Sequence, residues 1–387
     1  MIAIIYWVGL TLLFYTYLGY PIVISFISFF KKNLNSFSSW EEADLPSVTL
    51  IIPAYNEADL LKEKIQNSLY LNYPEDKLRI VVVADGSTDA TPTIAESYME
   101  VDLLYQPERR GKSAALNRAM QHVKSDVVVF SDANTYLRAD TLLHMVQPFT
   151  DEAVAGVSGE KTVQVRDQDG TNAAGEGLYW KYESFLKRKD AEVHSIMGAA
   201  GELIALRTDC YTELDESTIL DDFMLSLRLV EDGRRIAYVP EAKALERASA
   251  SIKDELKRKV RIAAGGWQSI VWLASLLQFW KHPLISFMYV SHRVLRWSIS
   301  AFALPLVFIL NAFLTQEGLE YQLLLIGQVA FYLLAAIGFR ERENPNKRMM
   351  LFVPYYFTMM NYAVWAGFIR FLNNNQSAVW ERAQRAT

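Results

Sequence analysis

The hydrophobic residues of this chain form short runs in its middle and long uncharged runs at its two ends. Residues 1–30 contain no Asp, Glu, Lys, Arg or His, and Lys31 and Lys32 follow at once. This run is longer than the core of a signal peptide and has no basic start, so we predict a retained transmembrane helix over residues 1–32. Uncharged runs at 297–314, 322–339 and 349–369 predict three further transmembrane helices within residues 283–373.

The basic residues beside these runs predict how the chain is oriented. Lys31 and Lys32 place the middle of the chain in the cytoplasm, and the basic segment 340–348 then lies on the same side. A fifth uncharged run, 262–280, would move that segment outside if it crossed. Its polar and apolar residues alternate at helical spacing, so we predict amphipathic interfacial helices over 251–282, with a tail over 374–387. An integral protein of the plasma (inner) membrane with a cytoplasmic domain is expected.

Residues 47–250 alternate short apolar runs with amphipathic stretches. The apolar runs predict buried strands at 48–53, 80–84, 101–105 and 127–130, and helices are predicted between them at 57–70, 88–98 and 112–123. This alternation is typical of a parallel sheet with right-handed crossovers. Further helices are predicted over 141–149, 172–189 and 221–231, and strands over 154–165, 203–206 and 236–239. The expected fold class is α/β, with transmembrane helices at both ends.

Two acids stand at the ends of neighbouring predicted strands. Asp85 follows the run 79–84, and Asp132 follows the run 127–130. The carboxyl ends of parallel strands meet at one edge of a sheet, where open α/β sheets bind ligands. A nucleotide diphosphate requires Mg²⁺ or Mn²⁺ held by carboxylate oxygens, so Asp132, with help from Asn134, is the candidate ligand. Asp85 suits the nucleoside better, although it could also cap its turn.

Three further candidates each have a plainer alternative. Lys112 follows a glycine at a predicted helix start, where it could meet phosphate or be a solvated surface lysine. Asp222 could be a general base for a sugar hydroxyl, or could compensate the dipole of the helix it begins. Asn56 and Glu57 could belong to the site or cap a helix.

The composition excludes or disfavours several classes of protein and of metal site. The net charge of −5 and the 13% of aromatic residues argue against a disordered chain and against nucleic acid as a partner. Cys210 is the single cysteine, so an intrachain disulfide and a Cys-rich metal site are excluded. The five histidines show no HxxxH or HxH spacing, which argues against a zinc site.

Six motifs follow one another through the middle of the chain. They are IPAYNE (52–57), VVADGSTDAT (82–91), RRGKSAALN (109–117), FSDAN (130–134), GAAGELIALR (198–207) and LDDFMLSLRL (220–229). In this order they resemble the motifs of membrane family 2 glycosyltransferases, which include cellulose, hyaluronan and poly-N-acetylglucosamine synthases. The resemblance implies a GT-A fold, Rossmann-like with a mostly parallel sheet, over residues 47–250. It also implies inverting transfer from a nucleotide sugar, expected to be UDP-linked, to a growing polysaccharide or glycoconjugate.

On the donor side the resemblance implies a role for each matching residue. Tyr55 and Glu57 would lie at the nucleotide base, and Asp85 at the nucleoside. Lys112 would lie near the diphosphate. Asp132 would hold the metal, Mg²⁺ or Mn²⁺, in a motif that here reads Asp-Ala-Asn and ends at Asn134.

On the acceptor side the resemblance places Gly201 and Glu202 near the acceptor and makes Asp222 the general base. The Q-x-x-R-W pattern of processive polymerases reads Arg-Lys-Val-Arg-Ile at 258–262. Arg261 remains as a candidate for binding the diphosphate. The stacking tryptophan is absent, and Trp267 is the candidate that could replace it.

The sequence leaves the acceptor open. The partners implied are a nucleotide sugar, a saccharide or lipid-linked acceptor, the lipid bilayer and a polysaccharide-export system. One alternative is transfer of a single sugar to a lipid-linked acceptor. Another is a non-catalytic, nucleotide-binding membrane subunit of an export system, against which the retained Asp132 and Asp222 argue.

Overall fold

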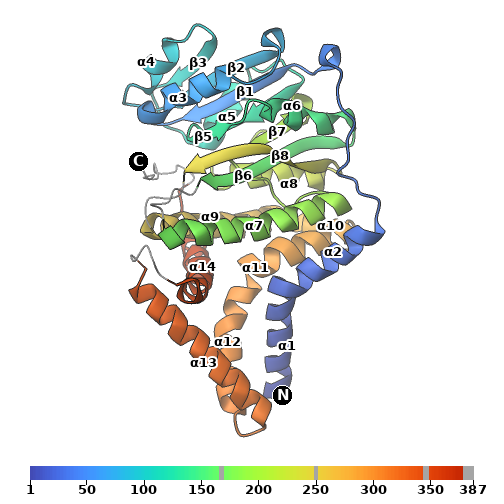
Figure 1. The fold of residues 1–387 in the computed structure, drawn as a ribbon, viewed down its shortest axis with the longest axis vertical. Helices are drawn as coiled ribbons and strands as arrows, with labels where there is room; N and C mark the ends of the chain where they lie inside the picture. Colours follow the sequence, from blue (N-terminus) through green and yellow to red (C-terminus); the bar gives the residue numbers. More distant parts are fainter. Residues whose placement is uncertain (165–169, 248–251, 343–347, 378–387) are drawn as a thin grey trace.

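The computed structural model describes residues 1–164, 170–247, 252–342 and 348–377. An α/β domain lies at one end of the molecule, and helices from both ends of the chain lie at the other (Figure 1). The sheet has eight strands in the order β3-β2-β1-β4-β7-β6-β8-β5. The strands are β1 Val48–Ala54, β2 Leu78–Asp85, β3 Val101–Gln106, β4 Val127–Phe130, β5 Thr135–Leu137, β6 Val154–Gln164, β7 Ile204–Arg207 and β8 Arg235–Arg247.

The first four strands form a parallel unit, as the sequence predicts. β1 pairs in parallel with both β2 and β4, and β2 pairs in parallel with β3. β7 is antiparallel to β4 and β6, β8 is parallel to β6, and β5 is antiparallel to β8. The connecting helices are α3 Ala58–Leu69, α4 Thr91–Glu96, α5 Lys112–Met120 and α6 Thr141–Val146. The sheet is therefore mixed and mostly parallel.

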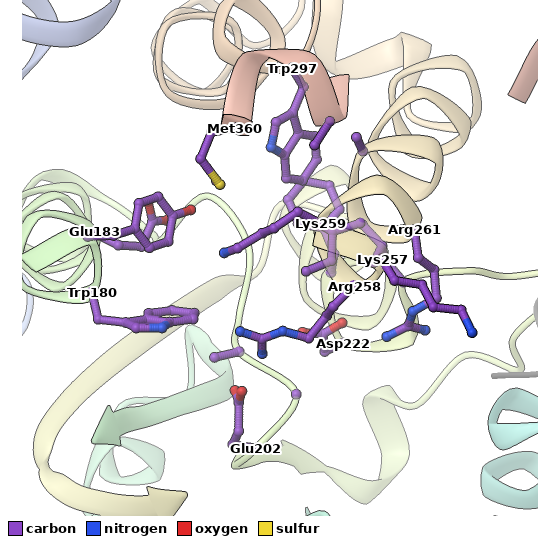
Figure 2. Close-up of a pocket in the computed structure, with 18 of the residues that line it drawn as sticks. Trp180, Glu183, Glu202, Asp222, Lys257, Arg258, Lys259, Arg261, Trp297 and Met360 are labelled. Atoms are coloured by element: carbon purple, nitrogen blue, oxygen red, sulfur yellow. The ribbon is translucent and has the colours of Figure 1, made fainter. Parts of the chain in front are cut away.

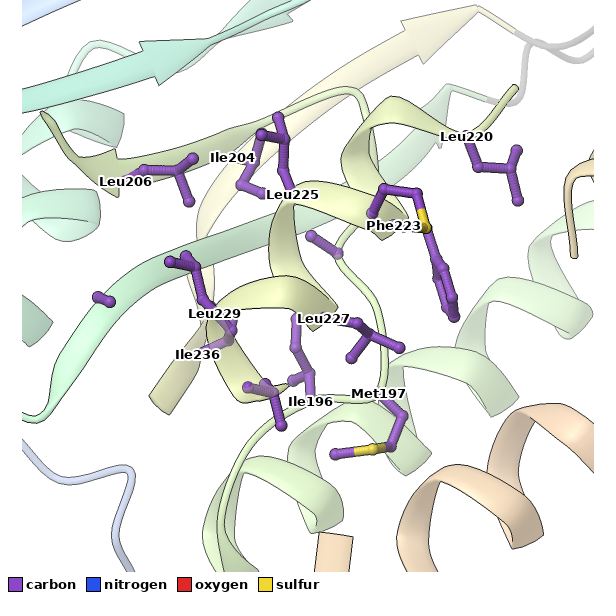
Figure 3. Packing of buried hydrophobic residues seen from close by; sticks show 14 of the residues in the cluster. Ile196, Met197, Ile204, Leu206, Leu220, Phe223, Leu225, Leu227, Leu229 and Ile236 are labelled. Carbon is purple, nitrogen blue, oxygen red and sulfur yellow. The ribbon is translucent and has the colours of Figure 1, made fainter. Parts of the chain in front are cut away.

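Side chains of β1 alternate between two hydrophobic cores, one on each face of the sheet. Leu50 and Ile52 belong to one core and Ile51 to the other, as the two-residue period of a strand requires. Both faces are covered, so the central strands contain continuous apolar runs. On the face shared with Ile51, helix α8 (Asp221–Glu231) packs Leu225 and Leu229 among other apolar side chains of the sheet and its loops (Figure 3).

Helices run beneath this second face and separate the sheet from the terminal helices (Figure 1). They are α7 Gly170–Val193, α9 Ile252–Trp272 and α10 Pro283–Tyr289. The terminal helices are α1 Ile2–Phe14 and α2 Tyr20–Phe30, joined by the π-helical turn Tyr15–Gly19, and α11 Leu295–Trp297, α12 Ile299–Leu314, α13 Leu319–Arg340 and α14 Met349–Leu372.

Among the described residues, two helices are long and apolar enough to cross a membrane, Ile2–Phe30 and Leu319–Arg340. A third results if Pro283–Trp297 and Ile299–Leu314, which are bent by 57° at their junction, count as one span. Helix α14 is not among them, and Figure 1 shows it nearly end-on, whereas α1 and α12 are seen from the side. The four spans expected from the sequence therefore stay a prediction.

A buried network of charged and polar side chains joins both ends of the chain to α7. The Tyr20 hydroxyl donates to Asp190 Oδ1, and His292 Nδ1 lies 2.5 Å from Asp190 Oδ2. About two turns away on α7, Glu183 pairs with Arg296, at 3.0 Å. The N-terminal segment and the segment around residue 292 thus share one anchor on α7.

The predictions from the sequence were wrong for β5 and β8. β5 was not predicted, and β8 continues eight residues beyond the predicted strand 236–239. In this extension Ala242 and Ala244 face the core, and Glu246 is buried beside them. Two alanines and a glutamate give no hydrophobic alternation, so the strand could not be recognised.

Candidate active site

The ends of β1, β2 and β4 lie at the same edge of the sheet because parallel pairing aligns Ala54 with Ala84 and Ile51 with Phe130. Asp85 is the last residue of β2, and Asp132 follows β4 by two residues. The structure therefore brings both predicted acids to one edge. The first turn of α8 adds Asp221 and Asp222 to it.

Asp85 organises a small cavity at this edge. Its Oδ2 accepts hydrogen bonds from the backbone N–H groups of Arg110 (3.1 Å) and Gly111 (2.7 Å). The guanidinium of Arg109 lies over the Tyr55 ring, 3.6 Å from its centroid, and both side chains line the cavity with Asp85. Both the ligand and the turn-capping interpretation of Asp85 fit this geometry, because one carboxylate oxygen holds the 109–111 loop against the cavity.

A second and much larger cavity, of about 1960 Å³, begins beside the first. Its lining includes Glu57, Lys112, Asp132 and Asn134, whereas Tyr55, with which the resemblance grouped Glu57, lines the small cavity. The cavity continues between α7, α9 and α14 as far as the N-terminal helix.

Lys112 links a carboxylate that follows β4 to a carboxylate at the start of α8. Its Nζ lies 2.8 Å from Asp132 Oδ1 and 3.1 Å from Asp221 Oδ2. Burial alone would lower the pKa of Lys112, but Asp132 and Asp221 outweigh burial and raise it. The solvated-lysine interpretation is wrong, because this ammonium is mostly buried and is paired with two carboxylates.

Asp222 lies between the edge of the sheet and the segment that contains Gly201. A Cβ built on Gly201 would be 3.3 Å from Asp222 Oδ2, so the two residues are in contact. Burial, and then the charge of Asp221, raises the pKa of Asp222 to about 7, although Lys112 opposes the shift. A carboxylate with this pKa can accept a proton at neutral pH, which dipole compensation alone would not require.

Glu202 belongs to a buried charge network. The ammonium of Lys161 pairs with both Glu202 and Glu246, and the Asn134 side-chain amide donates to Glu246 at 3.0 Å. Burial would raise the pKa of Glu202, but Lys161 more than offsets it, and the pKa is lowered. Asn134 therefore orients this network, and its amide nitrogen is not turned to the carboxylate of Asp132.

Figure 2 shows the middle of the large cavity. The side chains of Arg258 and Lys259 enter it from α9, opposite Trp180 of α7, with Glu202 and Asp222 on one side and Met360 and Trp297 on the other. Arg261, the predicted diphosphate ligand, lines the same cavity.

The comparisons with known proteins fit this geometry. Residues 49–213 match the model of glycosyl transferase family 2. The chain thus contains a family 2 glycosyltransferase domain. This match agrees with the family that the six motifs resemble.

Two curated relatives and one solved structure are similar to a longer part of the chain. The poly-beta-1,6-N-acetyl-D-glucosamine synthase of Staphylococcus aureus (strain MSSA476) is 25% identical over 280 residues, which are 69% of this chain and 63% of that protein. The probable glycosyltransferase YdaM of Bacillus subtilis (strain 168) is 26% identical over 276 residues, 65% of this chain and 62% of that protein. The match thus spans less than two thirds of either relative.

The mannosyltransferase PcManGT from Pyrobaculum calidifontis, solved with GDP-Man and Mn²⁺, superposes with a TM-score of 0.72 at 23% identity. The superposition covers 97% of this chain and 99% of that one. The GT-A fold predicted from the sequence is confirmed.

The structure corrects the interpretation of Trp267. This side chain does not line the large cavity; its ring lies 4.6 Å from that of Phe368 and 6.4 Å from that of Phe302, measured between centroids. It packs α9 of the glycosyltransferase against α14 and α12. A tryptophan five residues beyond its expected position lies more than one helical turn away, so it cannot occupy the same place.

Other residues at the site were missed by sequence reasoning. Lys161 and Trp180 stand in no motif. The structure reveals them because Lys161 pairs with Glu202 and its ammonium lies 4.9 Å from the Trp180 ring centroid. Lys64 is fully buried beneath the Asp132 loop, where it donates to Ser131 (2.8 Å) and burial lowers its pKa to about 7. A lysine within an ordinary amphipathic helix gives no sign of this position.

Proposed function

We propose that this protein is an inverting glycosyltransferase that transfers a sugar from a nucleotide sugar to a polysaccharide or glycoconjugate at the membrane. One observation carries the proposal: Asp132, Lys112 and Asp222 gather at a single edge of a GT-A sheet and open into one cavity. A UDP-linked donor follows from the resemblance to the synthases. The solved mannosyltransferase holds GDP-Man, so the base is a question for the experiment below.

The residues divide the reaction between them. Tyr55, Arg109 and Asp85 bind the nucleoside, and Lys112 with Arg261 meets the charge of the diphosphate. Asp222 removes the proton of the acceptor hydroxyl, whose oxygen attacks the anomeric carbon from the side opposite the diphosphate. The bond from that carbon to the diphosphate oxygen breaks, and the configuration inverts. Gly201 and Glu202 line the acceptor side.

Asp132 is suited to bind a divalent cation whose other ligands include the phosphates of the donor. Its Oδ1 accepts from Lys112, its Oδ2 has no hydrogen-bond partner among the described residues, and its side chain is 32% exposed. No group of three or more Asp, Glu, His or Cys residues that could hold a metal occurs in the described part of the chain. Phosphate oxygens and water would therefore supply most ligands, as is usual for Mg²⁺. Bound there, Mg²⁺ or Mn²⁺ would neutralise the departing diphosphate.

The two candidate spans support a place in the bilayer. By the positive-inside rule Lys31 and Lys32 put the catalytic domain on the cytoplasmic side of the inner membrane. The domain division 1–32, 47–250, 251–282, 283–373 and 374–387 belongs to this proposal. A polysaccharide-export system would take the product if it is a polymer.

A second candidate function, transfer of one sugar to a lipid-linked acceptor, is favoured by a specific observation. Residue 262 is isoleucine, and Trp267 lies outside the cavity, so the stacking residue of the polymerase pattern is missing. The non-catalytic alternative is disfavoured, since Asp222 keeps a pKa of about 7 beside Lys112.

Release of nucleotide diphosphate from a panel of UDP- and GDP-sugars, with and without Mn²⁺, tests the proposal. We expect Asp222→Asn to slow release by about 10²- to 10⁴-fold, the usual contribution of a general base. In the wild type, release should fall about tenfold for each pH unit below 7, because the base must be ionised. Asp232→Asn, at the exposed far end of α8, is the matched control. Equal rates in the two variants would refute the assignment of the base.

A further inference from the structure

The large cavity has a mouth on the side of the terminal helices. Leu18, Phe185 and Val353 line the cavity and are 57%, 41% and 43% exposed, so we call these three residues the apolar mouth. They come from the N-terminal segment, α7 and α14. The edge is fixed by Tyr17, whose hydroxyl donates to Asn361 of α14 (3.0 Å) and whose carbonyl accepts from Tyr182 of α7 (2.8 Å).

The apolar mouth lies within sequence that is suited to lipid. Leu18 belongs to the apolar helix Ile2–Phe30, one of the two candidate spans. Val353 lies in the uncharged first half of α14. Exposed apolar side chains around an opening of this kind are expected where a hydrocarbon chain, and not water, fills the entrance.

The cavity also contains the side chain of a buried lysine, Lys187. Lys187 is only 4% exposed and lines the cavity, yet it makes no hydrogen bond or ion pair among the described residues. Its nearest aromatic contact is the Trp180 ring, 6.0 Å from its Nζ. Burial lowers the pKa of Lys187. Glu183 is the acid that acts most strongly on Lys187, but its carboxylate is already paired with Arg293 and Arg296. A buried ammonium without a hydrogen bond is costly, so this position favours the binding of an anion.

Lys259 adds a second ammonium near the Trp180 ring, with Glu255 3.5 Å from its Nζ. The Lys259 ammonium lies 4.4 Å from the Tyr179 ring centroid and 5.8 Å from that of Trp180. Lys161, whose charge is taken up by Glu202 and Glu246, lies on the same tryptophan at 4.9 Å. Lys187 and Lys259 therefore flank one ring between the apolar mouth and Glu202.

We propose that the acceptor is a saccharide carried on a phosphate-bearing lipid, whose phosphate binds between Lys187 and Lys259 and whose hydrocarbon chain leaves through the apolar mouth. A neutral polysaccharide would offset neither the charge of Lys187 nor the exposure of Leu18 and Phe185. The inference rests on the proposed function, since it names the acceptor of that same transfer.

The phosphate of the lipid takes no part in the bond changes. The saccharide hydroxyl loses its proton to Asp222, its oxygen bonds to the anomeric carbon of the donor sugar, and the nucleotide diphosphate leaves with the electron pair of the broken bond. The lipid phosphate stays intact and holds the hydroxyl in place. Growth of the lipid-borne glycan by one sugar is the expected product.

Lipid binding by the full chain in nanodiscs, without any donor, tests the inference directly. The probes are farnesyl phosphate, farnesol and inorganic phosphate, with binding followed through tryptophan fluorescence. We expect farnesyl phosphate to bind at least tenfold tighter than either of the others, and Lys187→Met to weaken it about tenfold, the effect of losing one charged contact. Lys189→Met, which removes an α7 lysine paired with Glu192 outside the cavity, is the control and should bind as the wild type does.

Each outcome has a defined meaning. Equal binding of farnesol and farnesyl phosphate, or unchanged binding in Lys187→Met, would overturn the proposal. If inorganic phosphate binds as tightly as farnesyl phosphate, the site serves a free anion and the lipid assignment falls. A protein that releases nucleotide diphosphate but does not bind farnesyl phosphate loses this inference alone, whereas binding without release refutes the proposed function alone. Lys187→Met is expected to fold, because it removes a buried charge.

Discussion

The site has two halves that are built in different ways. The nucleotide half lies at the ends of β1, β2 and β4, and each of its key residues stands at the end of a strand or the start of a helix. The acceptor half is enclosed by α7, α8, α9 and α14, which are up to 180 residues apart in the chain. Its cations, aromatic rings and apolar mouth come together only because these helices pack against one another.

The difference separates two kinds of recognition. In the nucleotide half, backbone pairing fixes where the carboxylates lie, so their spacing is tied to the register of β1 with its neighbours. In the acceptor half, Lys161 of β6 pairs with Glu246 of β8, and the Lys259 ammonium of α9 lies 4.4 Å from the Tyr179 ring centroid of α7. Substitutions in the first half should therefore affect chemistry alone, and those in the second should affect transfer and stability together.

The sharpest test of the nucleotide half is Asp132→Ala. We expect release of nucleotide diphosphate to fall by about 10³-fold, since the variant loses both the candidate metal ligand and the partner of Lys112. The apparent melting temperature should change little. Asp126→Ala removes an acid at the opposite end of β4, where it binds Ser47, and should keep its rate. If the activity of Asp132→Ala stayed within threefold of the wild type, the nucleotide half would not carry the chemistry that this comparison assigns to it.

Lys161→Met tests whether the acceptor half couples stability to transfer. Removal of the ammonium leaves Glu202 and Glu246 buried without their counter-charge, which should cost about 3 kcal/mol of stability and raise the pKa of Glu202. Transfer should fall about tenfold, and its decline at low pH should move to higher pH; melting curves and pH–rate profiles measure both. Lys161→Arg keeps the charge and should restore most of the loss. A stable Lys161→Met variant with an unchanged pH profile would contradict this coupling.

Trp267→Leu should give the smallest effect. Loss of the ring contacts with Phe302 and Phe368 should cost about 1 kcal/mol, seen as a lower melting temperature, with transfer unchanged. Trp180→Leu is the matched variant, because its ring lies in the cavity, and it should reduce transfer instead. If Trp267→Leu lost transfer at unchanged stability, the tryptophan would have to act on the acceptor after all.

The sequence predicted most of the nucleotide half and little of the acceptor half. The positions of Asp85 and Asp132 follow from local apolar runs that end in an acid, a pattern that requires no knowledge of distant residues. Lys187 and Trp180 lie in a helix of unremarkable composition, and their burial depends on where α9 and α14 pack. Trp267 was assigned to the site by spacing alone, and the helical turn between 262 and 267 carries it to another face.

The shared anchor on α7 has a mechanical consequence. Tyr20 and His292 both hold Asp190, so the apolar segments from the two ends of the chain cannot change their tilt independently of this helix. α7 also carries Trp180 and Lys187, whereas the carboxylates Asp85 and Asp132 are held by the sheet. A thicker or thinner bilayer would thus move α7, and with it Trp180 and Lys187, while leaving the nucleotide in place.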